Sequence, residues 1–246
     1  MNTLPVDLNC DLGEGMPYDD LLMPFITSAN IACGFHAGNT DTMRRTVDLC
    51  LEHGVKIGVH PSFRDREHFG RQEQQIPPEK VYTLVIEQLI KLDLIAREKG
   101  ALLHHVKPHG ALYNMAAREV RIARAVAQAV SDFNADLVMY GLSGSHLITE
   151  AKALQLATAS EVFADRRYDD DGRLVSRKLP GALIEEEARS LDQVRQMVLE
   201  GTVTSINGHI IPIVAETICI HGDGKRAPYF AREIHELLQG VSGNGQ

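Results

Sequence analysis

Val6-Asp-Leu-Asn-Cys-Asp-Leu-Gly-Glu-Gly15 is the stretch of sequence that decides the fold. Apolar and polar residues alternate along it as far as Asp11, with the period of two that a β-strand requires. Gly13 and Gly15 then break the run. The stretch predicts an N-terminal strand with chemically useful groups at its C-terminal end, namely Asn9, Asp11 and Glu14. Carboxylates in such a place can act as a general base, as metal ligands or as a clamp for a substrate.

Further strand-like runs follow along the chain, each with a helical pattern after it. With the first run they number seven: Val6–Asp11, Ser28–Cys33, Val55–Val59, Leu102–Val106, Leu137–Gly141, Leu156–Phe163 and Ile213–Ile220. Asn39 is expected to cap a helix that ends at Gly54, and the longest helix is expected between Pro77 and Gly100. Strands that alternate with helices at this spacing predict right-handed βαβ units and a parallel sheet.

The chain lacks the glycine-rich motifs of dinucleotide-binding and phosphate-binding folds. No GxGxxG follows the first strand, and no GxxxxGK[ST] occurs anywhere in the sequence. We therefore predict an α/β protein with an irregular, closed or nearly closed seven-stranded parallel β/α barrel. The 246 residues, of which 44% are hydrophobic, are enough for one substantial core. The prediction is a single domain over residues 1–246, with residues 240–246 as a frayed tail.

Composition restricts the partners and the compartment. Twenty-five basic residues against 33 acidic ones give a net charge of −8, which argues against nucleic acid or an anionic membrane surface as a partner. No secretory signal and no apolar run long enough to span a membrane is present. The four cysteines have no CxxC spacing and fall at expected core positions. Reduced, buried thiols and a cytoplasmic location are expected.

Chemically useful side chains follow six of the seven predicted strands. In a parallel barrel these ends meet at one mouth, where active sites lie. The candidates, with Asn30 added from within the second strand, are Asn9, Asp11, Glu14, Asn30, His36, His60, Lys107, His109, Asp165, Arg166, His221 and Asp223. Four histidines at four different strand ends are hard to attribute to packing. The other histidines, such as His53, His68, His104, His146 and His235, are assigned to ordinary structural positions.

These residue types are compatible with chemistry with or without a bound metal. Histidines and an aspartate at one mouth can bind Zn²⁺ or Mn²⁺. His105 and His109 straddle a strand end, so ligands are expected from separate strands. Without a metal, Asp11 or a histidine activates water while Lys107 stabilises developing negative charge. A structural ion pair between Lys107 and Asp11 is the alternative role for this lysine.

Several longer blocks resemble the LamB/YcsF family, and they occur in the family's order. The blocks are Asp7–Glu14, Asn30–Gly38, Gly58–Ser62, Phe69–Arg71, His105–Asn114, Glu161–Arg166, Asp171–Val175 and Cys219–Asp223. Members of this family serve as the A component of the bacterial ATP-dependent 5-oxoprolinase. The resemblance implies a seven-stranded β/α barrel related to the glycoside hydrolase/deacetylase superfamily, in agreement with the strand pattern.

The resemblance also implies an activity and partners. The expected reaction is hydrolysis of the lactam of 5-oxo-L-proline to L-glutamate, coupled to ATP hydrolysis with Mg²⁺ and shared with 5-oxoprolinase subunits B and C. Our hypothesis for the site makes Asp11 the general base and puts His60 and His109 near the reacting carbonyl. Lys107 and Arg166 would hold the substrate carboxylate or a phosphorylated intermediate. The remaining candidates, Asn9, Glu14, Asn30, His36, Asp165, His221 and Asp223, would complete the substrate site.

Two alternatives remain open at this point. One is a metal-dependent amide hydrolase or deacetylase with a bound catalytic divalent metal ion. The other is a non-catalytic subunit that binds a small carboxylic acid and presents it to a partner.

Overall fold

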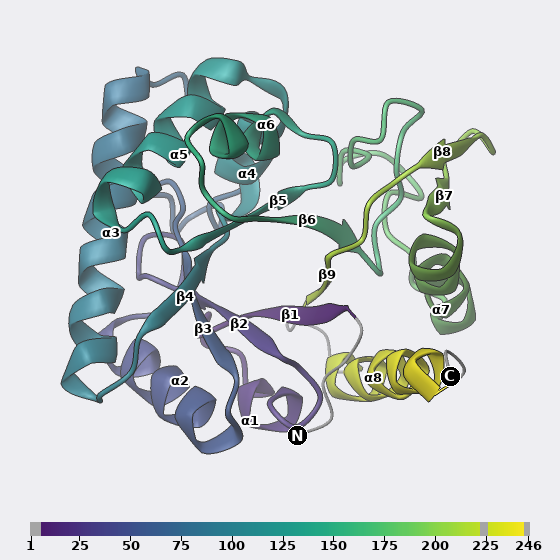
Figure 1. The fold of residues 1–246 in the computed structure, drawn as a ribbon, viewed down its shortest axis with the longest axis horizontal. Coiled ribbons are helices and arrows are strands. Elements are labelled where there is room, and N and C mark those ends of the chain that lie inside the picture. Colours follow the sequence, from purple (N-terminus) through teal and green to yellow (C-terminus); the bar gives the residue numbers. More distant parts are fainter. Residues whose placement is uncertain (1–5, 222–225, 244–246) are drawn as a thin grey trace.

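Seven parallel strands close into a barrel with helices around it, as the sequence predicts (Figure 1). The structure, a computed structural model, describes residues 6–221 and 226–243. The strands follow one another around the barrel as β1 (Asp7–Leu12), β2 (Ser28–Ala32), β3 (Lys56–His60), β4 (Leu103–Val106), β5 (Val138–Leu142), β6 (Thr158–Phe163) and β9 (Thr217–His221). β1 pairs with both β2 and β9, and this closes the barrel.

Helices occupy the chain between the strands and after β9. They are α1 (Asp19–Leu22), α2 (Thr40–His53), α3 (Pro78–Glu98), α4 (Gly110–Arg118), α5 (Val120–Phe133), α6 (His146–Ala153), α7 (Glu187–Arg195) with the π-helical turn η1 (Gln196–Glu200), and α8 (Ala227–Gly243). The predicted ends of α2 are confirmed. Asn39 accepts hydrogen bonds from the N–H groups of Asp41 and Thr42, and Gly54 ends the helix with φ = +67°. Within the described residues, no helix is long and apolar enough to cross a membrane.

One sequence prediction about an element boundary is wrong, and one helix was not predicted. The last strand begins at Thr217 rather than Ile213, because the chain before it forms a hairpin of β7 (Thr202–Thr204) and β8 (Ile210–Pro212). Helix α4 was not predicted, since its short apolar pattern directly follows polar strand-end residues. Of the predicted tail, residues 240–243 belong to α8, which runs from Ala227 to Gly243. Residues 244–246 of the predicted tail lie outside the described residues.

The alternation in β1 places its apolar residues outside the barrel and its polar residues inside. Leu8, Cys10 and Leu12 are fully buried in the hydrophobic core. Asp7, by contrast, accepts a hydrogen bond from Tyr140 on β5, a strand that is not its neighbour in the sheet. Such a bond must cross the inside of the barrel. Since buried polar groups need partners, the interior is held together by hydrogen bonds rather than by aliphatic packing.

Gly58 on β3 has no side chain, and the ring of His105 on β4 fills the space beside it. The two residues pair in register, and a Cβ at Gly58 would overlap the imidazole of His105. We expect Gly58→Ala to lower the free energy of unfolding by about 1–3 kcal/mol, measured by urea denaturation, because the core cannot absorb the added methyl group. Gly240→Ala is the control, since a Cβ there has no neighbour within 4 Å. Equal stability of the two variants would contradict this prediction.

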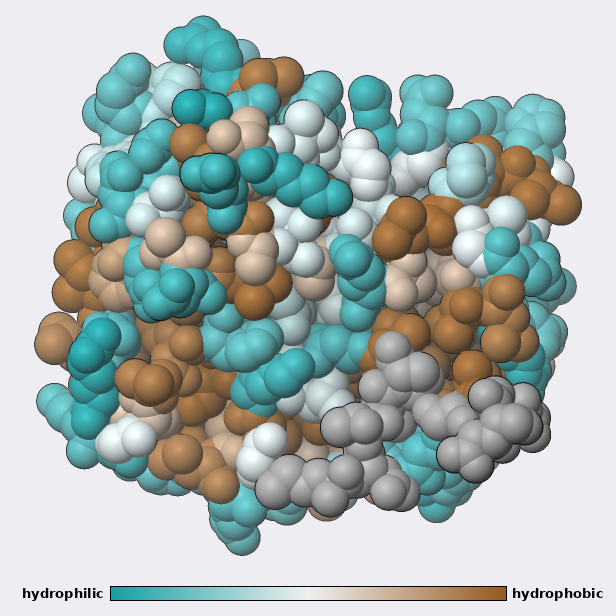
Figure 2. All heavy atoms as spheres, viewed as in Figure 1, coloured by the Kyte–Doolittle hydropathy of each residue, from teal (hydrophilic) through white to brown (hydrophobic). Residues whose placement is uncertain are grey.

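One side of the surface carries exposed apolar residues. Figure 2 shows hydrophobic residues gathered over the part of the molecule where β8 and α7 lie in Figure 1. Exposed apolar side chains of this part of the chain include Leu199, Ile210 and Val214. Gathered apolar surface of this kind is typical of regions that contact other proteins.

Candidate active site

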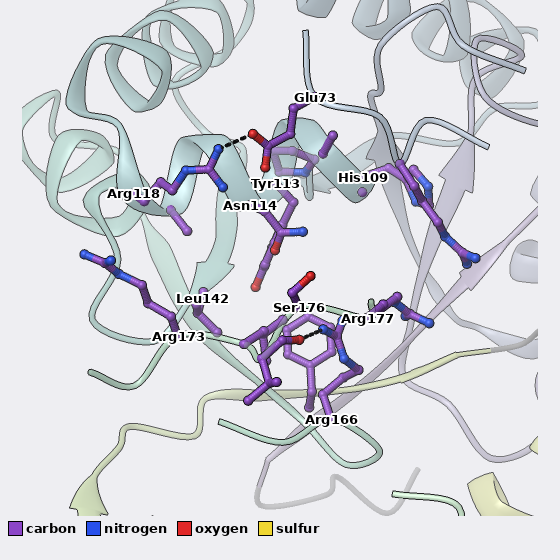
Figure 3. A pocket seen from close by; sticks show the side chains of 18 of the residues that line it. Glu73, His109, Tyr113, Asn114, Arg118, Leu142, Arg166, Arg173, Ser176 and Arg177 are labelled. Atoms are coloured by element: carbon purple, nitrogen blue, oxygen red, sulfur yellow. Dashed lines mark hydrogen bonds and ion pairs between the residues drawn. The ribbon is translucent and has the colours of Figure 1, made fainter. Parts of the chain in front are cut away.

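A cavity of about 790 Å³ opens at the C-terminal ends of the strands (Figure 3). Asp11 reaches it from β1, His60 from β3, and Lys107 and His109 from the segment after β4. Arg166 lines it from the loop after β6. The structure thus brings together all four predicted catalytic residues, because parallel strands place their C-terminal ends on one face of the barrel.

Lys107 is the centre of a buried network of polar groups. Its Nζ lies 2.9 Å from Asp11 Oδ1, 2.8 Å from Glu161 Oε1 and 3.1 Å from Asn9 Oδ1. It also lies 3.0 Å from the sulfur of Cys219. Burial lowers the pKa of Lys107, but Asp11, Cys219 and Glu161 outweigh it, and the net pKa is well above the ordinary value. The lysine is therefore a charged ammonium, and its ion pair with Asp11 is present.

Asn9 and Asn30 support this network from below the cavity. Both are fully buried, and neither is among the residues that line the cavity. Asn30 Nδ2 donates to Asn9 Oδ1 at 2.7 Å and to Asp11 Oδ1 at 2.9 Å. His105 Nε2 in turn donates to Asn30 Oδ1 at 2.8 Å. These hydrogen bonds fix the carboxylate of Asp11 in one orientation.

A second cluster lies beside Asp11 and contains Glu14, His36, His60 and His109. One ligand-type atom from each residue lies within 4.8 Å of those of the others. His60 Nε2 lies 3.0 Å from His109 Nδ1 and 3.3 Å from Asp11 Oδ2, while His36 Nε2 lies 3.2 Å from Glu14 Oε1. The rings of His36 and His109 stack with centroids 3.9 Å apart. Three of the four predicted strand-end histidines therefore converge.

Burial keeps two of these imidazoles neutral. It lowers the pKa of His36 to about 3, with a further lowering from His60. It also lowers the pKa of His109 well below the ordinary value. A neutral imidazole has one nitrogen lone pair, which can accept a proton or bind a metal ion.

The loop before α3 covers the histidine cluster. The carbonyl oxygen of Phe69 lies 2.9 Å from His109 Nε2, and the ring of Phe69 meets those of His36 and His109 edge-on. Gly70 has φ = +65°, and a Cβ there would overlap the Ser62 hydroxyl oxygen. Only glycine lets the loop approach the cluster so closely.

Arginines surround the outer part of the cavity. Figure 3 shows Arg118, Arg166, Arg173 and Arg177 around it, with Arg118 paired to Glu73. Arg166 is 5% exposed and donates to the Val175 carbonyl oxygen at 2.7 Å. Burial, and then the charge of Arg177, lower the pKa of Arg166 to about 10. Cations held this close together favour an anionic ligand.

Five further predicted residues are not placed in the cavity. Glu14 and His36 belong to the histidine cluster but are not among the lining residues. Asp165 is half-buried and is not among the lining residues. His221 ends β9, but its side chain lies outside the described part of the chain, as does the whole of Asp223.

Sequence analysis missed Glu161, Tyr113 and the arginines of the 173–178 loop. Glu161 lies two positions before the buried Phe163, so both side chains are on the same face of β6. The sequence pattern does not show whether that face is the inside or the outside of the barrel, and Glu161 was therefore not recognised. Burial and the nearby Glu161 raise the pKa of Tyr113 well above its ordinary value. Tyr113 lines the cavity from α4, the helix that was not predicted.

The fold and the site together define a β/α-barrel protein with a polar cavity at its mouth that several arginines line. Its sequence settles the family. The chain belongs to the LamB/YcsF family, whose model matches residues 6–244.

Similar proteins agree with this assignment. The chain is 51% identical to the A component of 5-oxoprolinase from Staphylococcus haemolyticus over 238 residues, covering 95% of each chain. It is 49% identical to the same component from Brevibacillus brevis over 241 residues, covering 96% of this chain and 95% of the relative. A crystal structure of a lactam utilization protein from Thermus thermophilus matches with a TM-score of 0.89 and 39% identity, covering 96% of this chain and 97% of that one. The relatives' names imply a hydrolase that works with partner subunits.

Proposed function

We propose that the chain is the A component of an ATP-dependent 5-oxoprolinase and holds the site where the lactam of 5-oxo-L-proline opens to L-glutamate. The observation that carries this proposal is the placement of Asp11. Its buried carboxylate lies between Lys107 at 2.9 Å and His60 at 3.3 Å, at the edge of a cavity surrounded by arginines. The names of relatives at about 50% identity support the same activity.

In this proposal Asp11 is the general base for the attacking water. A lactam is a stable amide, so its carbonyl carbon must be made more electrophilic before water can attack it. Phosphorylation of the carbonyl oxygen by ATP, which releases ADP, would do this. After one water adds to that carbon, the ring C–N bond breaks as the nitrogen takes up a proton. A second water then hydrolyses the resulting acyl phosphate to L-glutamate and inorganic phosphate. His60 and His109 line the cavity beside Asp11, within reach of the reacting carbonyl.

The ATP site is assigned mainly to the partner subunits B and C, with Mg²⁺ as its metal ion. This chain has no GxxxxGK[ST] motif. Its contribution would be the arginines around the cavity, which suit a carboxylate or a phosphorylated intermediate. The exposed apolar residues Leu199, Ile210 and Val214 support a role in an assembly. The free, buried cysteines support a cytoplasmic location.

Arg166 is proposed to bind the carboxylate of 5-oxoproline. Replacing it by methionine keeps much of the length of the side chain and removes the charge. We expect KM for 5-oxoproline to rise about 10- to 100-fold in the assembled enzyme, since a hydrogen bond to a charged group contributes about 1.5–3 kcal/mol. Arg44→Met is the control, because Arg44 pairs with Glu98 on the surface. An unchanged KM in Arg166→Met would rule out this role.

Glutamate release tests the proposed function. The purified chain is supplied with 5-oxoproline, ATP and Mg²⁺, first alone and then with candidate subunits B and C. Turnover in the mixture only is the expected result. Absence of turnover in both samples, with all subunits folded, would overturn the proposal.

The histidine cluster favours one second candidate, a metal-dependent amide hydrolase. Glu14, His36, His60 and His109 are ligand types found in catalytic zinc sites. This candidate predicts release of a carboxylic acid from an amide substrate by the isolated chain, without ATP.

A further inference from the structure

His60 and His109 face each other through two nitrogens that both carry lone pairs. The other nitrogen of His60, Nδ1, lies 2.7 Å from the carbonyl oxygen of Lys107. The other nitrogen of His109, Nε2, lies 2.9 Å from the carbonyl oxygen of Phe69. A carbonyl oxygen only accepts hydrogen bonds, so each ring must place its proton there. His60 Nε2 and His109 Nδ1, which are 3.0 Å apart, are then both unprotonated in the neutral rings.

Two carboxylate oxygens, which also carry lone pairs, lie close to these two nitrogens. Asp11 Oδ2 lies 3.3 Å from His60 Nε2, and Glu14 Oε1 lies 3.7 Å from His109 Nδ1. The same Glu14 oxygen lies 3.2 Å from His36 Nε2. His60 Nε2, His109 Nδ1 and the carboxylate oxygens beside them all offer lone pairs. These atoms repel one another at such distances unless a positive species lies among them.

Between His60 Nε2 and His109 Nδ1, which are 3.0 Å apart, that species is either a proton or a metal ion. One proton there would join only that pair of nitrogens. A metal ion, in contrast, attracts all the electron pairs at once.

We propose that Glu14, His36, His60 and His109 bind one divalent metal ion of the zinc type at the mouth of the barrel. Bonds of about 2.0–2.1 Å in tetrahedral geometry separate ligand atoms by about 3.3 Å. Three of the separations in the cluster, 3.0, 3.2 and 3.7 Å, lie around this value, and all four ligand atoms lie within 4.8 Å of one another. Three imidazoles select a borderline ion such as Zn²⁺ over Mg²⁺ or Ca²⁺, which prefer oxygen.

Two further observations fit a metal site. The carbonyl oxygens of Lys107 and Phe69 hold His60 and His109 by their outer nitrogens, the arrangement that orients metal-bound histidines in proteins. His36 is 1% exposed, and its Nδ1 has no hydrogen-bond partner among the described residues. When bound, such an ion would supply Lewis-acid polarisation or an activated water. His60 and His109 line the cavity, so a ligand there could reach it.

Metal content of the isolated chain tests the site without any substrate or partner. The chain is stripped with a chelator, incubated with Zn²⁺ or Mg²⁺, freed of unbound ions by gel filtration and assayed by mass spectrometry for metal per chain. We expect one retained Zn²⁺ and no retained Mg²⁺. His36→Asn and His109→Asn should each weaken Zn²⁺ binding by at least about 100-fold. His53→Asn is the control, because His53 is exposed at the end of α2 and should leave binding unchanged.

Retention of Zn²⁺ by the His36→Asn and His109→Asn variants at the wild-type level would overturn the proposal, as would substoichiometric Zn²⁺ in the wild type. A second measurement covers variants that fail to fold. Zn²⁺ should raise the melting temperature of the wild-type chain, and Mg²⁺ at the same concentration should not. An unchanged melting temperature in saturating Zn²⁺ would also overturn the site. These metal-binding experiments do not depend on glutamate release. The metal site can therefore fail while the proposed 5-oxoprolinase activity stands, and the reverse is also possible.

Discussion

Replacing Lys107 by methionine is expected to lower the free energy of unfolding by about 3–5 kcal/mol. The side chain is 2% exposed, and its ammonium lies within 3 Å of a carboxylate oxygen of both Asp11 and Glu161. Methionine fills much of the same volume but leaves two carboxylates buried without a cation. Urea denaturation of the purified chain measures the loss. Adding Glu161→Gln to the Lys107→Met variant should restore part of the lost stability, because one buried negative charge is then removed.

The control for this prediction is an ion pair of similar length on the surface. Lys99 Nζ lies 2.6 Å from Asp48 Oδ1, and the Asp48 side chain is 59% exposed. Lys99→Met should cost no more than about 1 kcal/mol, since water screens the pair. A Lys107→Met variant as stable as Lys99→Met would show that the buried network contributes little to folding.

Asp11→Asn is expected to lower kcat of the assembled enzyme by about 10²- to 10⁴-fold, the range that general base catalysis supplies. Asparagine has nearly the same shape, and its Oδ1 can still accept hydrogen bonds from Lys107 and Asn30, as Asp11 Oδ1 does. The change therefore removes the basic oxygen while the surrounding hydrogen bonds remain. Glutamate release in the presence of ATP and the partner subunits is the measurement. Full activity of this variant would show that Asp11 is not the base.

Asp7→Asn provides a matched control on the same strand. Asp7 and Asp11 both point into the barrel, but Asp7 lies at the opposite end of β1 and accepts hydrogen bonds from Ser28, Tyr140 and Thr217. Asp7→Asn should lower the free energy of unfolding by about 1–3 kcal/mol, because buried hydroxyl groups lose an acceptor. It should leave kcat unchanged. The two variants thus separate the structural carboxylate from the proposed catalytic one.

Much of the site could be predicted because strand ends are visible in the sequence. Polar residues that directly follow a buried run, such as Asp11, His60 and His109, must lie at one end of a parallel barrel. Glu161 could not be found in this way, because it lies within a strand and its role depends on which face of β6 is the interior. Helix α4 and the arginine-containing 173–178 loop were missed because neither has a long periodic pattern.

The sequence alone determined the order of the seven barrel strands, the barrel and the family, because these depend on local periodicity and on blocks of contiguous residues. Only the tertiary structure decided what the polar residues contact. Asn9 and Asn30 were predicted to bind the substrate, but they are buried beneath Asp11 and hold its carboxylate in place. Lys107 was assigned to an anionic ligand, with an ion pair to Asp11 as the alternative, and in the structure it pairs with Asp11 and Glu161. The physical reason is that hydrogen bonds across a barrel join residues far apart in the chain, and no local pattern records those distances.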